Sequence, residues 1–221
     1  MAQSLLIGLG GTGSRVVNNT IKLLKQNGLS FNNGEICCAV LDTNVNDAGE
    51  IRSSGTEVPV FETSKPQRIR DYLEQYHHLH IEEWCPQSTR FLNQSMIDGA
   101  SECRVKSSLA FMDCLETGVT DQLELMINQV LRNNTGSKIR IMIVSSLSGG
   151  TGSGMFIQMA LWLRKFFSQS QITIRGIFLL RKGSQRADFY KAETKIRHVV
   201  IKFSILIESS GQSDRIWKSA R

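Results

Sequence analysis

The pentapeptide GGTGS occurs twice in this chain, each time after a run of apolar residues. The first copy, Gly10–Ser14, follows the run Ser4–Leu9, and the second copy, Gly149–Ser153, follows the run Ile139–Val144. A short apolar run that stops at glycines is typical of a buried parallel strand that leads into a helix. Ligands of parallel sheets bind beyond the carboxyl ends of the strands. The repeat therefore predicts two strand-to-helix turns at the ligand-binding edge of one sheet.

The rest of the sequence continues this alternation of strands and helices. We expect further strands at Ile36–Leu41, Val58–Phe61 and Ile172–Leu180. The spacing of apolar residues predicts a helix after each glycine loop, and Gly28 can cap the first of these helices. Further helices are predicted to start at Ser64–Pro66 and to cover Ser101–Glu116 and Asp121–Arg132. The helix after the second loop, Met155–Phe167, is apolar almost all round and is expected to be sandwiched. This pattern predicts an α/β fold, a doubly wound and mainly parallel sheet with helices on both faces.

The two glycine loops have the composition of a phosphate-binding site. Glycines allow positive φ and a close approach of the backbone, and free N–H groups at a helix start attract anions. No lysine follows the last glycine of either loop, so neither is a Walker A sequence, and backbone N–H groups with Thr and Ser hydroxyls would hold the phosphates. A valine at Gly150 or Gly152 is expected to block the ligand and spare the fold. The predicted site residues are Gly10, Gly11, Thr12, Gly13, Ser14, Ser148, Gly149, Gly150, Thr151, Gly152, Ser153 and Gly154.

At these residues the sequence resembles the tubulin/FtsZ superfamily. GGTGSG at Gly149–Gly154 matches the signature loop of that superfamily, and the opening GLGGTGSRVVN at Gly8–Asn18 is similar to bacterial tubulin-like proteins. The resemblance implies an N-terminal, Rossmann-like GTP-binding domain that takes GTP or GDP with Mg²⁺. It also implies that Gly10–Gly13 contact the α and β phosphates, and that the signature loop embraces the phosphates from the other side.

Two further segments fit the same family pattern. Asp42 and Asn44, at the end of the second predicted strand, resemble the segment near the γ-phosphate and are candidates for water-mediated Mg²⁺ contacts. From position alone, Asp42 is equally a turn-forming residue, and a ribose-binding acid is a third reading. The segment Asp98–Ser101, with Gly99 and Ala100, lies where the family has a loop that senses the γ-phosphate.

The charge pattern divides the chain in two. Residues 181–221 hold 10 of the 26 Lys and Arg and 4 of the 20 Asp and Glu, which leaves 16 of each kind for residues 1–180. The body is therefore balanced, and its charge gives no support for nucleic-acid binding. The family resemblance also ends at Leu180. We expect a nucleotide-binding domain at 1–180 and a divergent basic tail at 181–221, truncated or altered relative to the family.

The resemblance implies that family members self-associate head to tail and that hydrolysis needs acids from the second domain of a neighbouring subunit. This sequence shows no such domain after Leu180, so we expect nucleotide binding without efficient turnover or polymerisation. The main alternative is an NAD-binding Rossmann oxidoreductase domain with Gly8, Gly10 and Gly13 at the pyrophosphate and Asp42 at the ribose. A folded remnant without a ligand is the third possibility.

Other classes of function find little support. No window approaches the roughly 18 apolar residues of a membrane span, and no signal peptide is evident, so a cytoplasmic protein is expected. The five cysteines form no zinc-like spacing and are expected to be free thiols. The cluster of His77, His78, His80 and Cys85 is a solvated helix end more readily than a metal site. No nucleophile elbow or catalytic triad is identifiable.

Overall fold

The protein is built around a single twisted sheet. The computed structural model describes residues 3–29, 36–44, 58–63, 65, 67–77, 81–96, 99–100, 103–132, 138–167, 171–180 and 197–201. The strands are β1 (Ser4–Leu9), β2 (Ile36–Asp42), β3 (Val60–Glu62), β4 (Ile139–Ser146), β5 (Ile172–Leu180) and β6 (Arg197–Ile201). Their order in the sheet is β3-β2-β1-β4-β5-β6. The first five run parallel, and β6 pairs antiparallel with β5.

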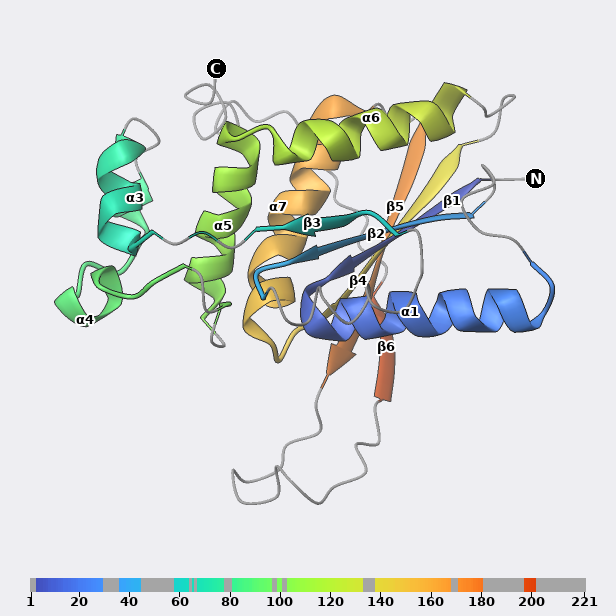
Figure 1. Ribbon diagram of the computed structural model, residues 1–221, viewed down its shortest axis with the longest axis horizontal. Helices are drawn as coiled ribbons and strands as arrows, with labels where there is room; N and C mark the ends of the chain where they lie inside the picture. Colours follow the sequence, from blue (N-terminus) through green and yellow to red (C-terminus); the bar gives the residue numbers. More distant parts are fainter. Residues whose placement is uncertain are drawn as a thin grey trace.

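Helices lie on both faces of this sheet (Figure 1). They are α1 (Gly10–Gln26), α3 (Ile69–Gln75), η2 (Ile81–Glu83), α4 (Thr89–Leu92), α5 (Arg104–Glu116), α6 (Val119–Arg132) and α7 (Gly150–Phe166). Helix α1 covers one face, whereas α5, α6 and α7 lie over the other face, and α3 and α4 lie beyond α5, past the carboxyl end of β3. The predicted fold class, a doubly wound and mainly parallel sheet with helices on both faces, is confirmed.

The alternation of side chains along β1 divides the core between the two faces. Leu5 and Ile7 belong to the larger cluster under α5, α6 and α7, whereas Leu6 packs with Val17 and Ile21 of α1. All five side chains are buried. Because β1 is covered on both faces, it reads as a continuous apolar run in the sequence, as buried parallel strands do. Burial of each such side chain contributes about 1.5–3 kcal/mol.

Three features differ from the sequence-based expectations. Helix α7 begins at Gly150, five residues before the predicted start, because the glycine loop itself forms the first helical turn. This helix is also not fully sandwiched, since Ile157 is 52% exposed and Phe166 is 47% exposed. Strand β6 was not predicted at all. The expected helix start at Ser64 and Pro66 lies outside the described residues.

Within the described part of the chain, no helix combines the length and the apolar character that crossing a bilayer requires.

Candidate functional site

The first glycine loop is the first turn of helix α1. Strand β1 ends at Leu9, the helix begins at Gly10, and Leu9 is its N-cap. Gly10 has φ +69°, a conformation that side chains with a Cβ rarely adopt. A Cβ on Gly10 would also lie 2.9 Å from the Cβ of Thr151 in the second loop. The glycine is therefore needed both for the sharp entry into the helix and for the close contact between the two loops.

The second loop is built in the same way at the end of β4. The strand ends at Ser146, and α7 begins at Gly150 with Gly149 as its N-cap. Helix α5 holds this turn in place, because the Ser107 hydroxyl donates to the Gly150 carbonyl at 2.8 Å and the Ser108 hydroxyl donates to the Gly154 carbonyl at 3.0 Å.

Several glycines of the two loops are required for close packing between the helices and the strands. A Cβ on Gly13 would lie 2.6 Å from the Val144 carbonyl oxygen, and a Cβ on Gly152 would lie 2.8 Å from the Leu9 carbonyl oxygen. Both distances are too short for non-bonded atoms, so the glycines set how closely the helices approach the strands. This corrects the expectation for Gly152, because a side chain there would disturb the fold.

The structure brings the two loops together around one cavity of ≈ 230 Å³ at the carboxyl edge of the sheet. Both copies of the pentapeptide contribute backbone to its wall, as the sequence predicted. The residues that line it are Leu9, Gly10, Gly11, Thr12, Arg15, Ser146, Gly149, Gly150, Thr151 and Gly152.

The backbone around this cavity favours a negatively charged ligand. The first N–H groups of a helix have no partner inside the helix, and the helix dipole places partial positive charge there. Neither α1 nor α7 has a side-chain hydrogen bond at its N-cap, and neither has an acidic residue in its first turn. Two helix N-termini of this kind meet at the same cavity, so their positive ends act together on an anion.

The remaining predicted loop residues support the loops from behind. Gly13 and Ser14 are buried in the first turns of α1. The Ser153 hydroxyl donates to the carbonyls of Gly149 and Gly150, and the Ser148 amide donates to the Ser146 hydroxyl at 3.1 Å. These bonds fix the shape of the second loop, and neither Ser148 nor Ser153 lines the cavity.

Gly154 is likewise a packing residue. A Cβ added to it would overlap the Ser107 hydroxyl and the Arg104 carbonyl on α5. It therefore sets the approach of α7 to α5.

The end of strand β2 lies next to the second loop. The hydroxyl oxygens of Thr43 and Thr151 share a hydrogen bond of 2.6 Å. Asp42 is 1% exposed, and its carboxylate accepts a hydrogen bond from the Asn44 backbone N–H at 3.1 Å. This is the arrangement of a turn-forming aspartate. A Cβ on Gly99 would lie 3.6 Å from the Asn44 Cβ, so Gly99 lies next to this strand end.

None of Asp42, Asn44, Gly99 and Ala100 is among the residues that line the cavity. Ala100 is 3% exposed, and the neighbouring Asp98 and Ser101 lie outside the described residues.

The sequence analysis missed four residues at the site. Leu9, Arg15 and Ser146 line the cavity, and Thr43 hydrogen-bonds to Thr151, which also lines it. Arg15 follows Gly11 by four residues, and this spacing places both residues on one face of a helix. That signal was available once the helix was known to start at Gly10. No pattern in the sequence pairs Thr43 with a residue 108 positions away.

Metal ligands do not cluster in the described part of the chain, where no group of three or more His, Cys, Asp or Glu could hold an ion. His78 and His80, two members of the histidine cluster, lie outside that part. All five cysteines are free thiols, as expected. Burial raises the pKa of Cys38 and of Cys114 to about 12 in each case, so both stay protonated at neutral pH.

Comparison with known proteins identifies the family of this chain. The family model described as "Tubulin like" matches residues 5–188. Among solved structures, CetZ1 from Haloferax volcanii, a GDP-bound monomer, has a TM-score of 0.50 at 15% identity, and the match covers 80% of this chain and 41% of that one. CetZ2 from the same organism, a GTPγS-bound protofilament, has a TM-score of 0.46 at 16% identity, covering 79% of this chain and 39% of that one.

At such identities the likeness to CetZ1 is one of fold. The chain spans about two fifths of the length of these solved structures. Among curated protein sequences, no match was found.

Proposed function

Because this chain belongs to the tubulin-like family, we propose that the cavity between α1 and α7 binds the phosphates of a guanine nucleotide, GTP or GDP. The observation that carries this proposal is the convergence of two acid-free helix N-termini on one cavity. Phosphate binding at helix N-termini needs no lysine, because the backbone N–H groups supply the hydrogen bonds.

The size of the cavity supports a phosphate site in particular. Pockets that enclose a whole drug-sized ligand measure about 300–1,000 Å³, and this cavity measures ≈ 230 Å³. It suits the phosphates, with the base lying outside the two loops. The guanine preference is therefore a proposal that rests on the family and on the GDP and GTPγS bound by the CetZ relatives.

Magnesium fits this site as a companion of the nucleotide. Mg²⁺ usually keeps several waters and is bound by substrate phosphates with one or two carboxylates. Asp42 is the carboxylate nearest in sequence to the Thr43–Thr151 contact, and we propose that it meets Mg²⁺ through water. Its buried position and its bond to the Asn44 amide make a direct ligand role less suitable.

The cavity supports binding better than turnover. Its functional side chains are the hydroxyls of Thr12, Ser146 and Thr151 and the guanidinium of Arg15. These groups bind phosphate, but none of them accepts a proton readily at neutral pH. We propose that the unit spanning residues 1–180 binds the nucleotide and that efficient hydrolysis needs a group from elsewhere. Head-to-tail self-association is a separate proposal, to be tested by sedimentation with GTP and with GDP.

A charge placed in the cavity tests the binding proposal. Thr12→Glu puts a carboxylate into the first turn of α1, which suits the helix dipole and spares the fold but repels phosphate. Asn19→Glu is the matched control, because the same change falls on an exposed residue of α1 about 10 Å further along the helix. Calorimetric titration with GDP should show binding for the wild type and for Asn19→Glu, and none for Thr12→Glu.

A parallel titration with NADH tests the dinucleotide alternative. Saturable NADH binding without GDP binding would reverse the assignment in favour of the Rossmann oxidoreductase reading. Equal GDP affinity in all three proteins would show that the nucleotide does not occupy this cavity.

A further inference from the structure

Arg15 is the charged residue among those that line the cavity. It lies on α1 one turn after Gly11, its side chain is exposed, and it lines the cavity. Of the ten lining residues, which all belong to the described part of the chain, Arg15 alone has a charged side chain. The other lining residues are five glycines, the hydroxyl residues Thr12, Ser146 and Thr151, and Leu9. The cavity therefore has one formal positive charge beside two sets of helix N–H groups.

These two kinds of group bind phosphate in different ways. Backbone N–H groups are fixed by the loops and neutral, so they hold one or two phosphoryl groups at set places. A guanidinium is always charged, reaches over several ångströms, and makes paired hydrogen bonds to phosphate oxygens. Each additional phosphate adds charge that amides alone do not neutralise. An exposed arginine that lines the cavity is suited to neutralise that excess charge.

We propose that Arg15 is a specificity-determining residue of this site, whose guanidinium clamps the outermost phosphate so that affinity depends on phosphate number. This inference rests on the proposed function, because it assumes that the cavity holds a nucleotide. Guanosine and GMP bind weakly, whereas GDP and GTP gain the contact with Arg15. The sequence analysis assigned no cation to the site, so this contact adds an element beyond the glycine loops.

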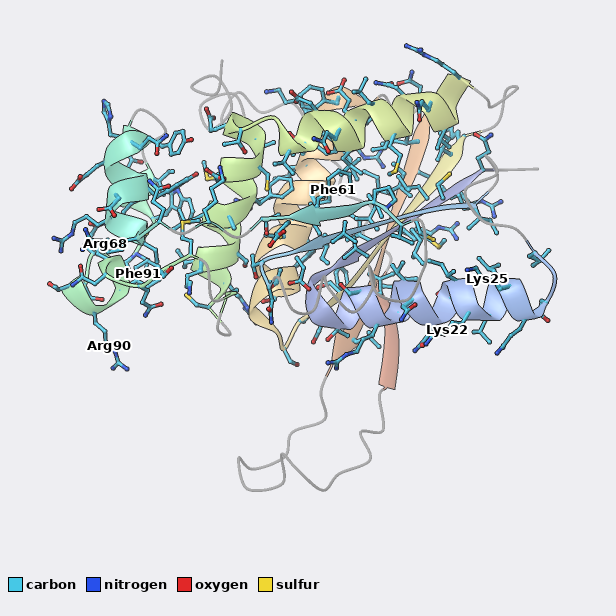
Figure 2. The ribbon with its side chains drawn as sticks, viewed as in Figure 1. Lys22, Lys25, Phe61, Arg68, Arg90 and Phe91 are labelled. Carbon is cyan, nitrogen blue, oxygen red and sulfur yellow. The ribbon has the colours of Figure 1, made fainter. Side chains whose placement is uncertain are left out.

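A general effect of surface charge is the competing explanation, and Lys22 provides its control. Lys22 is exposed on the same helix, seven residues after Arg15 and about 10 Å further along the axis. Figure 2 shows its side chain extending from α1 away from the sheet. Replacing either residue by glutamine removes one positive charge. At 10 Å, roughly one Debye length in 0.1 M salt, the charge of Lys22 is largely screened.

The experiment measures the dissociation constants of guanosine, GMP and GDP for the wild type, Arg15→Gln, Arg15→Lys and Lys22→Gln. We expect Arg15→Gln to weaken GDP binding about tenfold or more, the range of one charge-assisted hydrogen bond, and guanosine binding less than about twofold. Arg15→Lys should keep part of the affinity, because it keeps the charge without the paired geometry. Lys22→Gln should stay within about twofold of the wild type.

Two results would overturn the proposal. Equal losses in Arg15→Gln and Lys22→Gln would show a general charge effect, and an equal loss of guanosine and GDP binding would place Arg15 at the base or ribose. If the wild type binds no guanine nucleotide, the proposed function fails. Titration with pyrophosphate then tests separately whether Arg15 binds phosphate. Pyrophosphate binding that Arg15→Gln weakens would support the clamp. No pyrophosphate binding, or binding unaffected by that substitution, would refute it.

Discussion

Thr43 at the carboxyl end of β2 and Thr151 in the first turn of α7 share a hydrogen bond of 2.6 Å between their hydroxyl oxygens. Thr43 is 2% exposed, whereas Thr151 lines the cavity. The two residues are 108 positions apart in the sequence. The contact therefore joins the second glycine loop, which lines the cavity, to the end of β2 next to Asp42.

Removing the two hydroxyls should have unequal effects on stability. Thr151→Val leaves the buried Thr43 hydroxyl without this partner, and an unpaired buried hydroxyl costs about 1–3 kcal/mol. Thr43→Val leaves the Thr151 hydroxyl beside the cavity, where water can replace the bond, so it should cost less. Urea unfolding measures both changes, and the double variant should be less destabilised than the sum. Strict additivity would mean that the two hydroxyls are not coupled.

Two glycines of the second loop should respond differently to alanine. A Cβ on Gly152 would lie 2.8 Å from the backbone oxygen of Leu9, so we expect a loss of at least about 2 kcal/mol in unfolding free energy. At Gly149 the nearest heavy atom is 3.9 Å away, and φ is −88°. Gly149→Ala should therefore change stability by less than about 0.5 kcal/mol. Similar unfolding midpoints for both variants would contradict the packing role of Gly152.

An ion pair between the half-exposed Lys65 and the buried Asp113 anchors the chain after β3 to helix α5. The Lys65 Nζ lies 2.7 Å from the Asp113 carboxylate, whose side chain is 3% exposed, whereas that of Lys65 is 36% exposed. Lys65→Met should destabilise the fold by about 1–3 kcal/mol, below the figure for a fully buried pair because solvent reaches the lysine.

Asp113→Asn in the Lys65→Met background should restore part of the lost stability, because it removes the uncompensated charge. Urea unfolding of the three proteins measures this, and a further loss in the double variant would show that the carboxylate has other essential partners.

Stability should fall at alkaline pH because of buried thiols. The pKa of Cys38 and of Cys114 is raised by burial from 9.0 to about 12. Between these values the unfolded chain has lost the thiol proton and the folded chain has kept it. The free energy of unfolding therefore falls as pH rises. Each thiol should cost about 1 kcal/mol at pH 10 relative to pH 8.

The pH slope of the urea midpoint tests this expectation. Cys38→Ala should flatten the slope between pH 8 and pH 11, whatever its effect at neutral pH. Cys103→Ala serves as the control, since that side chain is partly exposed. A slope that is the same in the wild type and in Cys38→Ala would exclude this thiol as the cause.

The purified chain should hydrolyse GTP slowly. The side chains at the cavity are hydroxyls and a guanidinium, and a missing general base lowers a rate by about 10²–10⁴-fold. Phosphate release should stay near background at all protein concentrations. Turnover that rises with protein concentration and disappears in Thr12→Glu would show that a second copy completes the site.

The sequence by itself determined the alternation of strands and helices as far as β5 and the two glycine turns of the site. Strand β1 has the predicted bounds Ser4–Leu9, because a strand covered on both faces needs an unbroken apolar run. The two GGTGS copies were sufficient to place two strand-to-helix turns at one sheet edge. Both signals are local, since strand periodicity and glycine turns depend on residues that are near each other in the chain.

Tertiary structure alone decided how each residue of the site is placed and packed. A valine at Gly152 was expected to spare the fold, but the close packing of this glycine against Leu9 and Ser145 depends on where β1 and β4 end. Strand β6 and the exposed side of α7 were not predicted, because pairing at the edge of a sheet and the cover over a helix depend on distant neighbours. Arg15 reaches the cavity because α1 begins already at Gly10, and Thr43 meets Thr151 because the sheet places β2 near the start of α7. Such distances arise only when segments far apart in sequence pack together, so no local pattern encodes them.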